Sequence, residues 1–252
     1  MTAVGLSAVA RRRLHYFSGF DPRGAAHYHR LCREEAARPQ PQGGVLQVGA
    51  RDRLNPLDSR WRVTWRAQAD AADAVDTEQV FMGWDDQIRA HWARTPWALG
   101  RDFLAAYRGM VGGVGVGRAW ALSRQAFLTG VLPALFVLLG AVVAALGGGL
   151  ALWLGAWPPV AALLGVGVLA ALLAWGAHAG LFWLLRIFAF VMRLGRAPLP
   201  AMQDRTRQWA DTIVAMQTAD PVDEVLLVGH SVGTLVMIDT VDMLLADPHW
   251  QA

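Results

Sequence analysis

The fold class is decided by the stretch Val225-Leu226-Leu227-Val228-Gly229-His230-Ser231-Val232-Gly233-Thr234-Leu235. Its first four residues are typical of a buried strand, a G-x-S-x-G turn follows, and an apolar helix begins near Thr234. This is the order of elements around a serine nucleophile elbow, in which Gly229 and Gly233 let the strand and helix backbones approach closely. We therefore predict that Ser231 stands at the tip of an elbow, with the amides of the helix N-terminus directed at charge that develops beside it. The alternative is a glycine-rich turn whose serine only caps the helix.

The sequence after the elbow is short, because 21 residues follow Ser231. Elbow enzymes usually carry an acid and then a histidine downstream of the serine, and neither can be placed here with the expected spacing. We therefore expect the sequence to be a C-terminally truncated fragment. In such a fragment the elbow strand would have an unpaired edge. We expect residues 221–252 to fold poorly unless another segment or chain completes the sheet.

The composition favours a membrane protein, because 54% of the residues are hydrophobic and 17% are charged. All 23 basic residues are arginine, and the net charge of +3 is spread along the chain without a dense basic cluster. This distribution argues against nucleic-acid binding. Cys32 is the single cysteine, which excludes an intrachain disulfide. No metal cluster, phosphate loop or dinucleotide fingerprint is recognisable, so we predict neither a metal nor a cofactor.

An uncharged segment of 61 residues runs from Gln125 to Leu185. A bilayer crossing takes about 20 apolar residues, so the segment accommodates two spans and a turn. We predict helices over 126–147, or over 126–154 in a longer alternative, and over 159–185. The alternative is a buried helical hairpin of a soluble protein. His178 is the one ionisable residue within these spans, and we expect it to have a structural role.

Arginine placement predicts the orientation of the hairpin. Arginines flank both spans and none lies in the connecting loop, so the positive-inside rule puts both flanks in the cytoplasm. The flanking arginines are Arg118, Arg124, Arg186, Arg193 and Arg196.

The remaining elements suit an α/β sheet with the membrane hairpin inserted into it. Period-two patterns or apolar runs predict strands over 14–17, 45–48 and 61–65, and helical patterns cover 24–37, 78–109 and 201–217. We divide the chain into an N-terminal part of the α/β domain (1–124), the transmembrane hairpin (125–195) and the elbow part of the domain (196–252).

Large apolar residues, three of them aromatic, follow one face of the helix predicted over 78–109, at the positions Phe81, Trp84, Ile88 and Trp92. Thr95-Pro96 restarts this helix in N-cap and N1 positions. Packing against the domain or the hairpin is the favoured explanation of the aromatic face. An interfacial helix or the wall of an acyl-binding pocket is the alternative.

Two segments resemble the α/β-hydrolase superfamily. Gly229-His230-Ser231-Val232-Gly233 is similar to the lipase and esterase elbow, and Ser18-Gly19-Phe20 resembles the oxyanion loop, with Ser18 in place of a histidine. The resemblance implies an incomplete α/β-hydrolase-like sheet, Ser231 as nucleophile, and the backbone amides of Val232 and Phe20 as the oxyanion hole. The whole chain also resembles bacterial membrane proteins that embed such a domain around a two-helix hairpin. That likeness implies the bacterial inner membrane, and the arginine placement then predicts that both termini are in the cytoplasm.

A serine nucleophile needs a base. The candidate bases are His15, His27, His29, His91, His230 and His249, and the elbow helix adds the carboxylates Asp239 and Asp242. No combination of these residues gives a convincing triad.

Two functions are therefore expected. The first is a membrane-anchored serine hydrolase that cleaves an ester or thioester through an acyl-enzyme at Ser231 and is inactive as the truncated chain. The second is a non-catalytic membrane scaffold or binding protein with a hydrolase-like fold. The expected partners are the lipid bilayer and a lipid or acyl-ester substrate, without nucleic acid, and the oligomeric state is left open.

Overall fold

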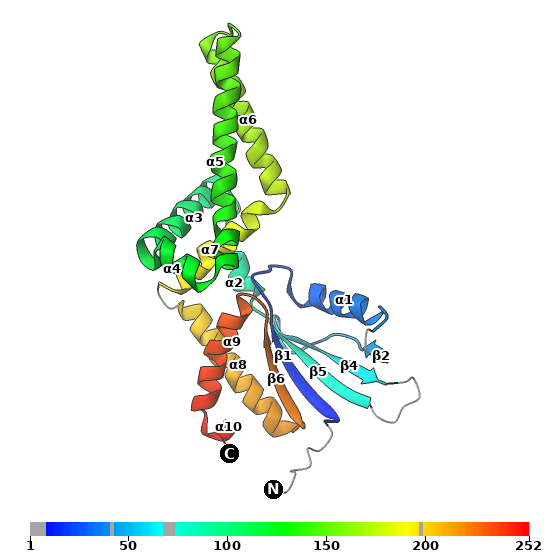
Figure 1. The fold of residues 1–252 in the computed structure, drawn as a ribbon. Helices are drawn as coiled ribbons and strands as arrows, with labels where there is room; N and C mark the ends of the chain where they lie inside the picture. The colour runs from blue at the N-terminus through cyan, green and yellow to red at the C-terminus, as the bar shows by residue number, and fades with distance from the viewer. Residues whose placement is uncertain (1–8, 41–42, 68–73, 197–198, 252) are drawn as a thin grey trace. The chain divides into compact units, whose positions relative to one another are not determined.

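The computed structural model describes residues 9–40, 43–67, 74–196 and 199–251. The chain divides into two compact units, of which the first comprises Met1–His91 and Pro198–Ala252 and the second comprises Trp92–Ala197. The first unit holds the sheet, and the second contains only helices among its described elements. The predicted α/β class is confirmed as a mixed α/β fold with two long apolar helices (Figure 1).

Six strands form one mixed sheet within the described part of the first unit, in the order β2-β4-β5-β1-β6 with β3 beside β4. The strands are β1 (Arg11–Phe17), β2 (Val45–Val48), β3 (Asp52–Arg53), β4 (Ser59–Arg66), β5 (Ala74–Met82) and β6 (Glu224–Gly229). The central strand β1 is parallel to both β5 and β6, whereas β4 is antiparallel to β5 and β2. Parallel pairing places the C-terminal ends of β1, β5 and β6 at the same end of the sheet, where loops follow them.

Helices cover both faces of this sheet. They are α1 (Gly24–Ala36), α2 (Asp85–Ala90), α8 (Pro200–Ala219), α9 (Gly233–Ala246) and α10 (Pro248–Gln251). On one face, Ala25 of α1 packs in a buried cluster with Trp61 and Phe81. On the other face, the ring of Phe17 meets Trp209 of α8 edge-on, with centroids 5.3 Å apart. Alternation along β1 accounts for this division, since neighbouring side chains of a strand point to opposite faces.

The helix predicted over 78–109 is wrong in its first part, because residues 74–82 form β5. Val80, Phe81 and Met82 are all fully buried between the neighbouring strands β1 and β4. A central strand that is covered on both faces has no alternation of apolar and polar residues. The three- and four-residue spacing of Phe81, Trp84 and Ile88 therefore matched the pattern of a helix. The predicted restart at Thr95-Pro96 is confirmed, since the Thr95 side chain accepts a hydrogen bond from the Ala98 amide at 3.1 Å.

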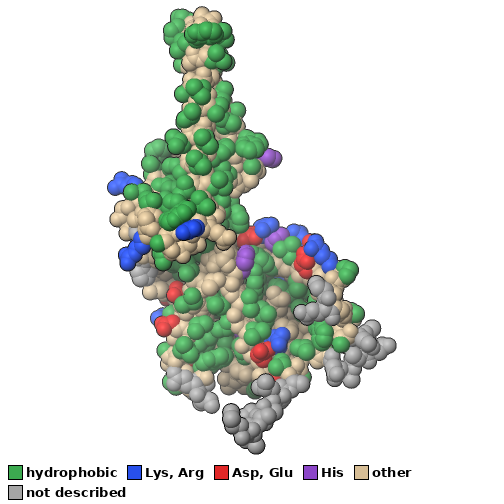
Figure 2. All heavy atoms as spheres, viewed as in Figure 1, with side chains coloured by type: hydrophobic (Ala, Val, Ile, Leu, Met, Phe, Trp, Pro, Cys, Tyr) green, Lys and Arg blue, Asp and Glu red, His purple; other side chains and the backbone are tan. Residues whose placement is uncertain are grey.

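The second unit is built from α3 (Pro96–Gly109), a short π-helical segment η1 (Met110–Val114), α4 (Val116–Leu122), α5 (Arg124–Trp153), α6 (Pro158–His178) and α7 (Leu181–Leu194). Helices α5 and α6 are long and apolar enough to cross a membrane, with mean hydropathies of 2.4 and 2.2. In each, 11% of the most apolar window is buried by the protein, unlike the core helix of a soluble protein. Hydrophobic side chains dominate the visible surface of this pair (Figure 2).

Small residues let α5 and α6 pack closely. A Cβ added at Gly148 would lie 3.1 Å from the carbonyl oxygen of Ala161, and one at Gly165 would lie 3.1 Å from that of Ala144. Close contact of helix backbones through glycine and alanine is typical of helix pairs in membranes.

The second span ends earlier than predicted, because α6 stops at His178 instead of running to residue 185. Gly180 has a φ of 77°, a left-handed conformation that glycine adopts freely and that ends helices. The chain then begins α7, whose Phe182 and Leu185 pack with Ala106 of α3. His178 is therefore the last residue of α6 and does not lie in the middle of a span.

Candidate active site

Ser231 lies in the turn between β6 and α9, and its side chain is exposed. Among the described residues other than glycine, it is the one with a positive φ, at 55°. A left-handed conformation costs an L-residue about 1–2 kcal/mol, so the surrounding structure must hold it. Strand, sharp turn and helix thus follow one another at the G-x-S-x-G sequence.

Two glycines make this turn possible. A Cβ at Gly229 would come within 2.6 Å of Thr234 Cα, and a Cβ at Gly233 would overlap the carbonyl oxygens of Phe17 and Ser18. Helix α9 therefore starts directly against the end of β1, at a distance that only glycine permits.

The loop after β1 lies beside the elbow. His230 donates its backbone N–H to the carbonyl oxygen of Phe17 at 3.0 Å, which extends the pairing of β6 with β1. A Cβ at Gly19 would lie 3.1 Å from His230 Nδ1 and 3.4 Å from Ser231 Cβ. The structure thus brings together the two segments, Ser18-Gly19-Phe20 and the G-x-S-x-G turn, that are more than 200 residues apart in the sequence.

The amide of Val232 is available to a ligand. The next three amides donate within the turn, from Gly233 to His230, from Thr234 to Ser231 and from Leu235 to Val232. No acceptor for the Val232 N–H is found among the described residues. Phe20, the other residue expected in the oxyanion hole, is buried, and its ring packs edge-on against Trp84.

No described residue is hydrogen-bonded to the Ser231 hydroxyl. His230 is exposed beside Gly19. His15 is fully buried in β1, and neither of its ring nitrogens has a hydrogen-bond partner in the described part of the chain. Burial, helped by the charge of Arg13, lowers the pKa of His15 to about 3, so this imidazole is neutral at physiological pH.

The other candidate bases are engaged elsewhere. His29 Nε2 donates to the carbonyl oxygen of Gly49 at 2.9 Å, and His91 Nδ1 donates to that of Gln87 at 2.9 Å. His27 accepts a hydrogen bond from Arg30. The side chain of His249 lies outside the described residues.

The carboxylates of α9 do not complete the site either. Burial, followed by the neighbouring charge of Asp242, raises the pKa of Asp239. Both residues belong to the helix that follows the turn, and neither is hydrogen-bonded to a described histidine.

Two aspartates beside strand ends, Asp21 after β1 and Asp58 before β4, were not among the predicted site residues. Burial alone would raise the pKa of Asp21, but hydrogen bonds from the side chain and backbone of Arg23 outweigh it and lower this pKa. Asp58 accepts the Gly83 amide at 2.6 Å and so ties the turn before β4 to the end of β5. Both aspartates lie in turns next to strand ends, Asp21 before Pro22 and Asp58 before Ser59. This turn signal in the sequence could have identified them.

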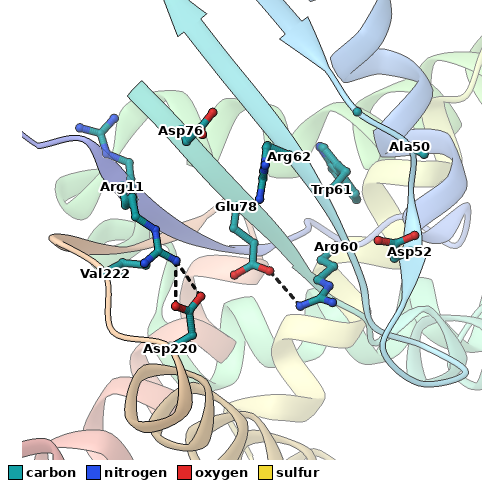
Figure 3. Close-up of a pocket in the computed structure, with 12 residues that line it drawn as sticks. Arg11, Ala50, Asp52, Arg60, Trp61, Arg62, Asp76, Glu78, Asp220 and Val222 are labelled. Atoms are coloured by element: carbon teal, nitrogen blue, oxygen red, sulfur yellow. Dashed lines mark hydrogen bonds and ion pairs between the residues drawn. The ribbon is translucent and has the colours of Figure 1, made fainter. Parts of the chain in front are cut away.

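A polar cavity of about 480 Å³ lies near the other ends of the strands (Figure 3). Arg11 binds the carboxylate of Asp220 with two hydrogen bonds, and Arg60 forms an ion pair with Glu78 at 3.1 Å. Arg11 begins β1 and Phe17 ends it, so about 20 Å of strand separates the Arg11 end of the cavity from the elbow. Its arginines are largely neutralised by carboxylates, and it is not the surroundings of Ser231.

Among the described residues, no group of three or more histidine, cysteine or acidic side chains is arranged to hold a metal ion. Comparisons with models of known protein families, with characterised proteins and with solved structures find no match to this chain. A functional proposal therefore rests on the geometry of the elbow and on the apolar hairpin.

Proposed function

We propose that this chain belongs to a membrane-anchored serine hydrolase that cleaves an ester or thioester, with Ser231 as the nucleophile. The observation that carries the proposal is the φ of 55° at Ser231, an exposed serine between a strand and a helix. Backbone strain of this kind is concentrated at functional sites, and a strained strand-turn-helix serine is the defining feature of hydrolase elbows. The sheet would accordingly be an incomplete hydrolase-like sheet.

In the proposed reaction, Ser231 Oγ attacks the carbonyl carbon of the substrate. A new Oγ–C bond forms while the carbonyl electrons move to the oxygen, which the Val232 and Phe20 amides would stabilise. The oxyanion then collapses and expels the alcohol or thiol, which receives the proton that a base took from Ser231. Water hydrolyses the acyl-enzyme by the same steps.

The described residues around Ser231 do not supply the general base that this reaction needs. Strand β6 pairs only with β1 in the described sheet, so one edge of β6 is free. We propose that a further segment, from this polypeptide or from a second chain, pairs with this edge and brings the histidine and its acid to Ser231.

The hairpin is proposed to cross the inner membrane of a bacterium with both flanks in the cytoplasm. The support is the length and apolarity of α5 and α6 together with the arginines that flank them. Anchoring of the chain at the membrane favours a lipid or acyl-ester substrate.

The test is labelling by a fluorophosphonate probe in membranes from cells that express the native protein. We expect the probe to label the protein at Ser231, as located by peptide mass, and Ser231→Ala to abolish labelling. Ser123→Ala is the matched control, since Ser123 only caps α5 through the Ala126 amide. Absence of labelling on folded native protein would overturn the proposal.

A non-catalytic scaffold is the second candidate, favoured by the absence of a described base at Ser231 and by the free edge of β6. Under this function, Ser231→Ala leaves every property of the protein unchanged. A partner would bind by adding a strand to β6. Val228→Arg, at an exposed position of β6, would then remove partner binding without affecting the fold.

A further inference from the structure

The second unit contains an apolar groove of about 650 Å³ between α3, α5, α6 and α7. This volume is within the range of small-molecule sites. Its walls are mainly hydrophobic, as shown by Leu99, Phe103, Val137, Leu173, Phe182 and Leu185. Its polar side chains are those of Arg94, Thr95 and Arg186, and no acidic residue lines it.

Arg186 is positioned at this groove by a hydrogen bond from Nε and by the face of a tryptophan ring. Its Nε donates to the carbonyl oxygen of Ala93 at 2.9 Å, and its guanidinium carbon lies 4.9 Å from the centroid of the Trp92 ring. No described residue accepts a hydrogen bond from Nη1 or Nη2. Arg193, two turns further along α7, is instead paired with Asp102.

The surroundings of Arg186 favour an anion. Burial lowers the pKa of its guanidinium, while the charge of Asp102 opposes that change, and the group stays protonated. A charged group that is half buried among apolar side chains gains free energy when a counter-ion reaches its free N–H groups. Asp102 is already occupied by Arg193, so the free N–H groups of Arg186 remain for a ligand.

The whole second unit is suited to an anionic membrane. Residues 92–197 contain eight arginines and a single acidic residue, Asp102. The outer face of α3 exposes Trp97 at 83% and Leu104 at 62%, next to the exposed arginines Arg101 and Arg108. A helix that presents tryptophan, leucine and arginine to the outside is typical of the membrane interface. Its first turn, beside Arg94, would then lie at headgroup level.

We propose that this groove binds one anionic phospholipid from the surrounding bilayer, with the phosphate on Arg186 and Arg94 and an acyl chain along the apolar walls. The inference rests on the proposed membrane insertion of α5 and α6. The planar guanidinium matches phosphate geometry, and basic pockets between membrane helices on the cytoplasmic side bind anionic headgroups. The groove would hold the lipid through the two arginines and the apolar walls, and this binding requires no reaction at Ser231.

The experiment is native mass spectrometry of the full chain in detergent micelles with added phosphatidylglycerol or phosphatidylcholine. We expect the wild type to retain one phosphatidylglycerol and to retain phosphatidylcholine at least about tenfold less. Arg186→Ala removes the phosphate contact, and Leu173→Trp fills the groove while keeping Arg186. Each should lower phosphatidylglycerol retention by about tenfold or more.

Arg124→Ala is the matched control. Arg124 also lies over a tryptophan ring, that of Trp120 at 5.5 Å, but it does not line the groove. Its loss should leave retention unchanged, and circular dichroism should show that every variant is folded. Because Arg186→Ala also removes the bond to Ala93, Leu173→Trp provides the test should that variant unfold.

Equal retention by the wild type and both groove variants would overturn the site, as would equal retention of the two lipids. The hydrolase proposal fails separately, through absence of probe labelling, and Ser231→Ala should retain phosphatidylglycerol normally. Release of the chain from native membranes by alkaline carbonate would contradict insertion of the hairpin and with it the bilayer as the source of the lipid.

Discussion

The indole Nε1 of Trp84 donates a hydrogen bond to the carbonyl oxygen of Ser18 at 3.0 Å. Trp84 follows β5 and Ser18 follows β1, and both residues are buried. The bond therefore joins the ends of two parallel strands and fixes the loop that lies against Ser231.

Replacing Trp84 by phenylalanine should loosen this loop. The carbonyl oxygen of Ser18 would be left buried without this donor, at a cost of about 1–3 kcal/mol in the free energy of unfolding. Urea titration in detergent micelles, followed by far-UV circular dichroism, measures the change. Probe labelling of Ser231 should also become slower, because the Phe20 amide moves with the loop.

Trp209→Phe is the control for this substitution. Trp209 is equally buried, but its Nε1 has no hydrogen-bond partner among the described residues. The two variants lose the same side-chain volume, and Trp84→Phe in addition removes the bond to Ser18, so it should be the more destabilised of the two. Equal destabilisation would show that the bond to Ser18 contributes nothing.

Gly233→Ala should disrupt the elbow. The new Cβ would overlap two backbone oxygens, which cannot turn aside as a flexible side chain can. We expect a loss of about 2–4 kcal/mol in the free energy of unfolding and loss of probe labelling. Gly49→Ala is the matched change, because its Cβ would meet the Arg62 carbonyl at an ordinary 3.5 Å. If both variants unfold at the same urea concentration, the close approach at Gly233 is not as described.

Ser231→Gly should be more stable than Ser231→Ala. Alanine keeps the unfavourable left-handed conformation, whereas glycine adopts it freely and loses only part of that gain to backbone entropy. The expected difference is about 1 kcal/mol in the free energy of unfolding. Both variants should fail to react with the probe. A glycine variant no more stable than the alanine variant would mean that Ser231 is not strained.

His15 should make the protein sensitive to mild acid. Its pKa is about 3 in the folded protein, against about 6.5 in an unfolded chain, so the unfolded state binds more protons between these values. The contribution of His15 to the free energy of unfolding is therefore fully present well above pH 6.5. It falls as the pH decreases below that value, by up to about 1.4 kcal/mol per pH unit. Unfolding titrations at pH 7 and pH 5 measure this loss.

His15→Leu isolates the effect of this histidine. Hydrogen bonds to Arg11 lower the pKa of Asp220 and backbone hydrogen bonds lower that of Asp223, so these carboxylates add acid sensitivity of the same sign mainly below about pH 4. These contributions remain in the leucine variant, so its stability should fall less between pH 7 and pH 5. Identical pH dependence in the two proteins would contradict a buried, neutral His15.

The sequence predicted those elements whose signals are local. The strand over 45–48, the helix cap at Thr95 and the order of elements around Ser231 all depend on neighbouring residues. Strand β5 was missed because its burial on both faces depends on helices that pack on the sheet and are distant from it in the sequence. The end of α6 at Gly180 was missed because apolar residues continue on both sides of it.

The candidate site shows the same division. The turn at Ser231 could be predicted, since glycines, strand and helix are adjacent in the sequence. The contact of Gly19 with Ser231 is a long-range one, made only because β1 and β6 pair in parallel. The buried imidazole of His15 is likewise set by α8 and the strands around it, and nothing local to Leu14-His15-Tyr16 distinguishes it from a surface histidine.

The pairing of β1 with β6 also has a consequence for biosynthesis. Arg12 pairs with Glu224, so the ribosome must translate both apolar helices before β1 can acquire its second neighbour. From the end of β5 at Met82 to Glu224, translation at about 5–20 residues per second takes roughly 7–28 s. Throughout that interval the nascent chain carries a half-built sheet while α5 and α6 leave the ribosome. The edge of β1 that later pairs with β6 therefore stays unpaired until both apolar helices have been synthesised.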